Sequence, residues 1–202
     1  EQGENGSDPT FSSETALDQA LTVLEDKGLL GWDRRANRYD LHPIVRGVVW
    51  NHLAADKQYE IHGSLRVHFE AMPTIENYTQ VESVEDLRPA IELYNSLVEM
   101  KLYDEACDVF NERLSGATLY RLSANHLRIE LLERLFMKGI EHPPALSSKR
   151  DQAWTLGAIG HGYLGIGLLN KAIPLFDHQK KILSISNNRM DLAIALANLS
   201  HS

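Results

Sequence analysis

The most regular alternation of apolar and polar positions lies in residues 153–176. Its small or apolar residues are spaced mostly by three or four positions: Leu156, Ile159, Gly160, Tyr163, Gly167, Ala172 and Phe176. This spacing predicts a helix, a tight turn between Gly167 and Lys171, and a second, antiparallel helix. Helix axes approach to about 8–10 Å only where the crossing side chains are small. We therefore expect Gly160 and Ala172 to face each other at the crossing.

Part of this pattern recurs towards the end of the chain. Leu196 and Leu199 repeat the positions of Leu156 and Ile159, so a further helical unit is expected to begin near position 193 and to be cut off at Ser202. A truncated unit cannot cover its own apolar face, so we expect Leu196 and Leu199 to be partly exposed or covered by a neighbouring molecule. The missing initiator methionine and the truncated unit together suggest a segment of a longer protein.

Residues 13–56 combine two helical patterns with a hairpin pattern. A serine can cap a first helix whose apolar residues recur at helical spacing as far as Gly28. Two short stretches, 29–32 and 38–42, flank a polar turn and predict a β-hairpin. Pro43 suits the first turn of a second helix. Helix, hairpin and helix together form the closing half of a winged helix.

The remaining segments predict a mainly α chain. Residues 1–12 are polar and predicted to be a linker, and residues 57–80 to be a helical connector with a break at Pro73. Residues 81–202 carry successive helical patterns, of which the last is truncated. One of these patterns predicts a pair of helices from Leu119 to Phe136. The fold predicted is a partial winged helix with a short hairpin, followed by an array of helical repeats.

Two stretches resemble known families. The small residue, aromatic residue, turn glycine, alanine and second aromatic residue between Gly160 and Phe176 resemble the tetratricopeptide repeat (TPR). The sequences Leu17-Asp-Gln-Ala-Leu21 and Tyr39-Asp-Leu-His-Pro-Ile-Val-Arg46 resemble the winged helix of bacterial STAND/NB-ARC-type signalling ATPases. In those proteins a nucleotide-binding module precedes the winged helix, and a helical-repeat sensor often follows it. The resemblance therefore implies a TPR-like array over residues 81–202 and a winged-helix-like segment over residues 13–56.

The same resemblance implies a role for His42. In the family, a histidine at the junction between hairpin and helix contacts the phosphate of bound ADP and holds the resting state. His42 stands at that junction, although Leu41 and Pro43 replace the methionine and aspartate of the family pattern. Two roles for His42 stay open: nucleotide sensing in the intact parent, or a hydrogen bond to the nearby backbone. ADP or ATP would belong to the parent, and we expect no cofactor in this segment.

Composition and charge favour a protein as partner. The 202 residues carry 20 Lys and Arg against 28 Asp and Glu, a net charge of −8, which repels nucleic acids and anionic membranes. The sequence has no apolar run long enough to span a membrane and no signal peptide, so we expect a cytoplasmic protein. Its single cysteine, Cys107, fits a reducing compartment. Acidic neighbours are expected to raise the pKa of the Cys107 thiol and make it a poor nucleophile.

Three residues are the candidates for partner contacts. If the repeat pattern holds, Trp154, His161 and Leu164 point to the same concave side of the array. Gly157 and Gly165 would then leave a bare groove floor that could admit a partner. An alternative role for Trp154 is to cover the preceding repeat.

Other motifs give little support for chemistry. Gly160-His-Gly-Tyr-Leu-Gly165 matches the dinucleotide-binding pattern, but it follows a helical rather than a strand pattern. The histidines lack metal-ligand spacing, and no phosphate-binding G-x-x-x-x-G-K-[ST] loop occurs. We therefore predict no catalytic residue, no metal site and no enzyme activity in this segment.

The sequence thus predicts the sensor arm of a STAND-type ATPase. The array would bind a protein or peptide trigger, and the winged helix would relay binding to a nucleotide-binding module of the same parent chain. Two alternatives stay open: a TPR adaptor without a nucleotide switch, and a transcription regulator whose winged helix binds DNA. The hairpin arginines favour the regulator, but the acidic residues of the preceding helix would repel DNA phosphates.

Overall fold

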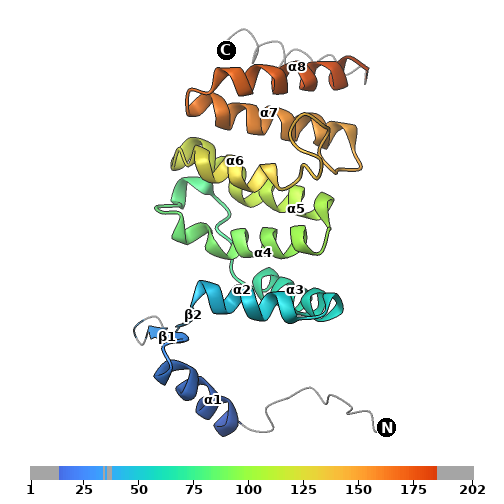
Figure 1. The fold of residues 1–202 in the computed structure, drawn as a ribbon. Coiled ribbons are helices and arrows are strands. Elements are labelled where there is room, and N and C mark those ends of the chain that lie inside the picture. The colour runs from blue at the N-terminus through green and yellow to red at the C-terminus, as the bar shows by residue number, and fades with distance from the viewer. Residues whose placement is uncertain (1–13, 34, 36–37, 186–202) are drawn as a thin grey trace, which may run out of the picture. The chain divides into compact units, whose positions relative to one another are not determined.

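A computed structural model of the chain describes residues 14–33, 35 and 38–185. Its described part is mainly helical, with one two-stranded antiparallel sheet (Figure 1). The chain divides into two units between Gln58 and Tyr59, which we call the N-terminal unit and the helical unit. The predicted linker, Leu196 and Leu199 lie outside the described residues.

The N-terminal unit contains the predicted helix, hairpin and helix. Helix α1 spans Glu14–Asp26, strands β1 and β2 span Leu30–Asp33 and Arg38–Leu41, and helix α2 spans Pro43–His52. Gly28 ends the first helical segment with a φ of +66°, a conformation that costs glycine little. The strands pair in antiparallel register, with Leu30 opposite Leu41. The predicted sequence of elements is therefore confirmed.

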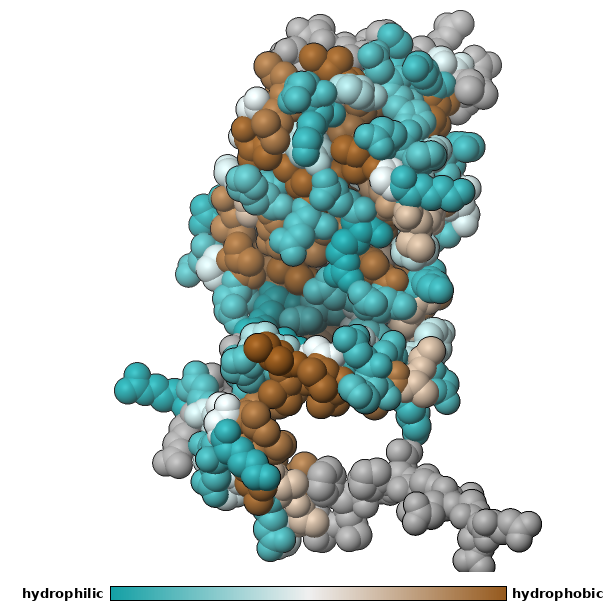
Figure 2. Space-filling view, viewed as in Figure 1, coloured by the Kyte–Doolittle hydropathy of each residue, from teal (hydrophilic) through white to brown (hydrophobic). Residues whose placement is uncertain are grey.

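Few side chains of the N-terminal unit are buried. Leu30, at 8% exposed, is the one buried apolar residue among the described residues of this unit. Ile44, Val48 and Val49 on α2 are 71%, 53% and 50% exposed. Figure 2 shows apolar side chains gathered on this part of the surface. The unit therefore presents an apolar face to solvent.

The helical unit begins within α3 and stacks antiparallel helices on one another. Helix α3 spans Ala55–Glu70 and crosses the boundary between the units, and α4 spans Arg88–Glu99. Short 3-10 turns, η1 (Tyr78–Gln80) and η2 (Glu85–Leu87), connect them. Helices α6, α7 and α8 follow later, over Asn125–Glu133, Lys149–Gly165 and Leu169–Ile185. Figure 1 shows α4 to α8 lying roughly parallel to one another in successive layers.

One long helix, from Tyr103 to Arg121, changes its pitch along its length. It starts as α5 (Tyr103–Val109) and contains two π-helical segments, η3 (Phe110–Leu114) and η4 (Ala117–Arg121). The sequence pattern placed Leu119 in a new pair of helices that runs to Phe136, whereas Leu119 belongs to the end of this long helix.

Helices α7 and α8 form the hairpin that the small residues of this stretch predicted. Gly167 makes the turn with a φ of +76°, and Ala172 is fully buried. A Cβ on Gly160 would lie 2.5 Å from the ring of Phe176, so only glycine allows this close approach. The predicted hairpin is confirmed, but the side chain nearest to Gly160 is that of Phe176 and not, as predicted, that of Ala172. The dinucleotide-like motif lies inside α7, which confirms that no strand precedes it.

The core of the helical unit joins all its layers. Its largest fully buried side chains come from α4, the long helix, α6, α7 and α8: Leu93, Tyr94, Phe110, Leu114, Leu132, Leu156, Ile159 and Phe176. Tyr94 donates a hydrogen bond to the carbonyl oxygen of Leu131 at 2.6 Å, which satisfies its buried hydroxyl. Tyr94 is therefore a buried and hydrogen-bonded core residue of α4.

Candidate functional site

A pocket of about 180 Å³ lies on one face of α7 in the helical unit. The long helix, α6, α7 and α8 supply the residues that line it: Ser115, Leu119, Tyr120, Arg128, Trp154, Gly157, Ala158, His161 and Gln179. Four consecutive helices therefore converge on this pocket.

The spacing along α7 explains why one helix supplies four of these residues. Trp154, Gly157, Ala158 and His161 stand at positions i, i+3, i+4 and i+7, which share one face of a helix. Trp154 packs edge to face on Phe110, with ring centroids 6.2 Å apart. Gly157 and Ala158 thus lie between Trp154 and His161 on this face of α7.

Arg128 is the polar anchor of the pocket. Its side chain comes from α6 and is only 2% exposed. Nε donates to the carbonyl oxygen of Ala158 at 2.8 Å, and Nη1 donates to the carbonyl oxygen of Ser115 at 3.0 Å and to Oγ1 of Thr118 at 3.2 Å. The guanidinium also lies 5.5 Å from the ring centroid of Phe110. These contacts tie α6 to α7 and to the long helix.

The charge of Arg128 has no carboxylate beside it among the described residues. Burial lowers the pKa of Arg128 to about 10, because the charged form loses its hydration. Its third nitrogen, Nη2, makes no hydrogen bond within the described part of the chain. One donor of a buried cation is therefore left for a group that enters the pocket.

Gln179 forms another side of the pocket and also lacks a partner. The residue is 7% exposed, and its buried Oε1 accepts no hydrogen bond from any described residue. Its carboxamide lies over Gly157, where a Cβ would come within 2.4 Å of Nε2. The predicted bare floor at Gly157 is therefore wrong, because Gln179 covers it. Gly165 is exposed and does not line this pocket, and a Cβ there would meet the side chain of Asn125 at 2.4 Å.

The structure brings together two of the three predicted contact residues. Trp154 and His161 both line the pocket and are half-buried, and the imidazole of His161 packs edge to face on Phe176. Leu164 lies away from the pocket and packs against the apolar core. Trp154 also contacts Phe110 of the preceding layer, so it covers that layer and lines the pocket at once.

Arg128 and Gln179 were not predicted from the sequence. A signal for Arg128 was present, because it precedes Leu131, Leu132 and Leu135 by three, four and seven positions. That spacing places a charged residue on the buried face of a helix. The sequence held no comparable signal for Gln179.

His42 lies in the N-terminal unit and caps α2. Its exposed imidazole accepts a hydrogen bond from the backbone nitrogen of Ile44, with 3.3 Å between Nδ1 and nitrogen. The cap satisfies one of the free N–H groups at the start of the helix. Nearby, Arg46 forms an ion pair with Asp40 at 3.0 Å. The local backbone role that the sequence left open is therefore present.

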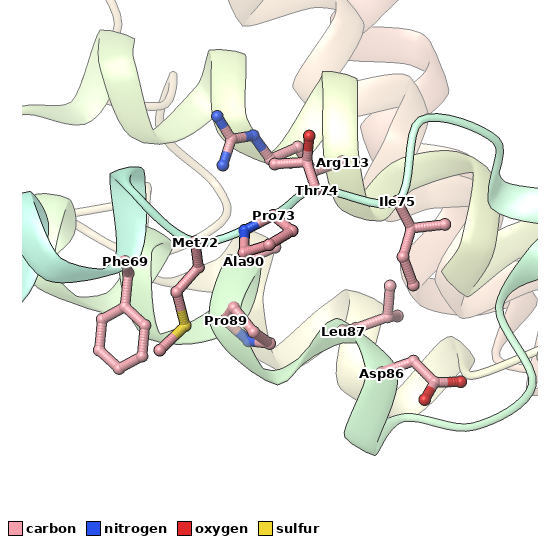
Figure 3. A pocket seen from close by; sticks show the side chains of 10 residues that line it. All are labelled: Phe69, Met72, Pro73, Thr74, Ile75, Asp86, Leu87, Pro89, Ala90 and Arg113. Carbon is pink, nitrogen blue, oxygen red and sulfur yellow. The ribbon is translucent and has the colours of Figure 1, made fainter.

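Two other hollows fit a ligand less well. The first is a cavity of about 30 Å³, large enough for about one water; its ten lining residues, shown in Figure 3, include Phe69 on α3, Leu87 and Arg113. The second, of about 530 Å³, borders α8 between Ile140 and Lys181, and its polar lining residues are exposed or half-buried.

The described residues contain no group of three or more histidine, cysteine, aspartate or glutamate side chains arranged to hold a metal ion. No described helix combines the length and the apolar character needed to cross a membrane. Burial, followed by its acidic neighbours, raises the pKa of Cys107 to about 11. The predicted direction for this thiol is confirmed, but burial rather than charge is the main cause.

Comparisons with protein-family models, with curated proteins and with solved structures found no match to this chain.

Proposed function

We propose that the helical unit is a TPR-like protein-interaction module that binds a peptide segment of a partner in the Trp154 pocket. The observation that carries the proposal is the pocket itself, whose lining includes Trp154, His161 and Tyr120. Two polar side chains of the same lining have unused hydrogen-bonding capacity: the buried Oε1 of Gln179 and Nη2 of Arg128 have no hydrogen-bond partner among the described residues. Aromatic side chains supply contact area at a small entropic cost, and a few fixed polar groups supply specificity.

Selection from a random peptide library tests this function. The immobilised chain should enrich linear peptides, and Trp154→Ala should remove most of their binding because it deletes the largest aromatic wall of the pocket. Leu168→Ala is a matched control, since Leu168 is 38% exposed and lies outside the pocket. Circular dichroism should show the same helix content in all three proteins. If no peptide is enriched, or if Trp154→Ala binds as well as the unchanged chain, the proposed function is wrong.

We also propose that the N-terminal unit relays binding to a nucleotide-binding module of the same parent, as in STAND-type ATPases. The apolar face of α2 supports this role, because exposed apolar patches of this kind mark interaction sites. A trigger would shift the parent between resting and active states only through different affinities for the two. In this arrangement His42 would contact the phosphate of ADP and also cap α2.

Release of ADP from the purified parent tests the relay. If His42 contacts the nucleotide, His42→Ala should speed ADP release. His42→Asn should speed it to the same extent, although asparagine can still cap the helix. If both variants release ADP at the unchanged rate, His42 is a helix cap alone, and the peptide-binding function of the helical unit is unaffected by that result.

A further inference from the structure

The buried polar groups of the Trp154 pocket specify what the bound peptide must carry. A charged guanidinium that is buried without a carboxylate is unfavourable, because it loses its hydration and gains no counter-charge. Hydrogen bonds from Arg128 to Ala158 and Ser115 offset part of this cost, but carbonyl oxygens carry no full negative charge. The site therefore has an unmet preference for an anion.

The surroundings of the pocket strengthen this preference. The whole chain carries a net charge of −8, yet none of the described residues that line the pocket is acidic. Arg134, which directly follows the last residue of α6, forms an ion pair with Glu99 at 2.6 Å. Arg128 is thus a buried cation without the carboxylate that Arg134 has.

Gln179 adds a second requirement. Its buried Oε1 lacks a donor among the described residues, so a ligand that also offers an N–H would satisfy it. A peptide provides both groups within one residue, because an acidic residue carries a carboxylate on its side chain and an N–H on its backbone. The pocket volume of about 180 Å³ is enough for one such side chain but not for a long ligand.

We propose that the Trp154 pocket recognises an acidic residue within a peptide, its side-chain carboxylate accepting from Nη2 of Arg128 and its backbone N–H donating to Oε1 of Gln179. This inference rests on the proposed peptide-binding function and names the chemistry of its ligand. The peptide is anchored by an internal aspartate or glutamate, while Trp154 and His161 flank the anchored residue.

Two matched peptide libraries test the proposal. Both have blocked ends and random flanking positions, and they differ only in a fixed central residue, which is glutamate in one and glutamine in the other. The unchanged chain should retain the glutamate library about tenfold better or more, the size expected for a charge-assisted hydrogen bond. Arg128→Met should bind both libraries equally weakly. Arg134→Met, which removes the same charge away from the pocket, should keep the preference.

Gln179→Met provides a second test of the proposal, which remains valid if Arg128→Met fails to fold. The side chain of Gln179 makes no hydrogen bond in the described part of the chain, so replacing its carboxamide should leave the free energy of unfolding unchanged or raise it. The same variant should weaken binding of the glutamate library several-fold. A purely structural role for Gln179 would predict no change in binding.

Each failure has a separate meaning. Equal retention of the two libraries, lost on Trp154→Ala, overturns the acidic anchor and leaves peptide binding intact. Retention of neither library removes the proposed function itself. A third library, with a neutral centre and a free C-terminal carboxylate, overturns the internal anchor if it is retained best. Inorganic phosphate and free glutamate can also be compared as competitors at the same concentration. If phosphate displaces the peptides and glutamate does not, the preference for a carboxylate is overturned.

Discussion

Leu132 in the helical unit is fully buried, whereas Ile44 in the N-terminal unit is 71% exposed. The contrast extends beyond these two residues, because the helical unit has a continuous core and the N-terminal unit buries Leu30 alone among its described residues. Local signals such as Gly28 and Pro43 define the elements of the N-terminal unit. Packing between layers defines those of the helical unit. The two units should therefore respond differently to the same mutation.

Truncating matched leucines should give the largest difference. Leu132→Ala removes a side chain that is 0% exposed and should cost about 2–5 kcal/mol of unfolding free energy, through lost burial and the cavity left behind. Leu17→Ala removes a side chain that is 41% exposed and should change stability by about 0.5 kcal/mol or less. Urea unfolding measures both. Equal losses would mean that α1 is packed as firmly as α6, and the contrast between the units would fail.

Alkaline pH should selectively weaken the helical unit. Burial raises the pKa of Cys107 to about 11 from an ordinary value of 9.0, and burial also raises the pKa of Tyr94. The unfolded chain releases these protons first, so the stabilisation is complete below about pH 9 and is lost as the pH rises through the folded pKa. For Cys107 the loss is on the order of 2 kcal/mol.

Urea unfolding between neutral pH and about pH 11 measures this loss. Cys107→Ala removes one of the titrating groups and should make the decline shallower. A decline of the same steepness in the alanine variant would show that Cys107 does not contribute.

The turn glycines offer a smaller and more local comparison. Gly167 and Gly28 both have positive φ, and a Cβ at either position would meet nothing within 4 Å. Alanine at each site should therefore cost only backbone strain, about 1–2 kcal/mol. Gly167→Ala should lower the unfolding free energy of the helical unit. Gly28→Ala should instead speed amide exchange at His42, whose N–H donates to the carbonyl oxygen of Leu29. The contrast between the two glycines fails if both substitutions lower the free energy of global unfolding and neither changes amide exchange locally.

Sequence reasoning succeeded where the determinants are local. The hairpin of α7 and α8 follows from Gly160, Gly167 and Ala172, because a small residue at a crossing and a glycine in a turn have few alternatives. Pro43 and Gly28 likewise fixed the limits of the N-terminal elements. The same reasoning paired Trp154 with His161, since residues seven apart share a helix face.

Reasoning from sequence failed where several helices meet. Gln179 covers Gly157 from the next helix, and no periodicity within α7 reveals a side chain that arrives from α8. Leu119 was placed in the wrong helix because π-helical segments break the 3.6-residue period on which the assignment relied. Arg128 was overlooked because its buried position depends on hydrogen bonds to the long helix and to α7.

The two π-helical segments of the long helix also act as a phase shift. Each wide turn takes up about one residue more than an α-helical turn, and one residue in an α-helix corresponds to a rotation of about 100°. The first segment precedes Tyr120 and the second contains it, so both affect the direction in which Tyr120 leaves the helix towards the pocket. A one-residue deletion within Phe110–Leu114 would leave every later residue of the sequence unchanged. It would nevertheless rotate Tyr120 about the helix axis and away from its place in the pocket.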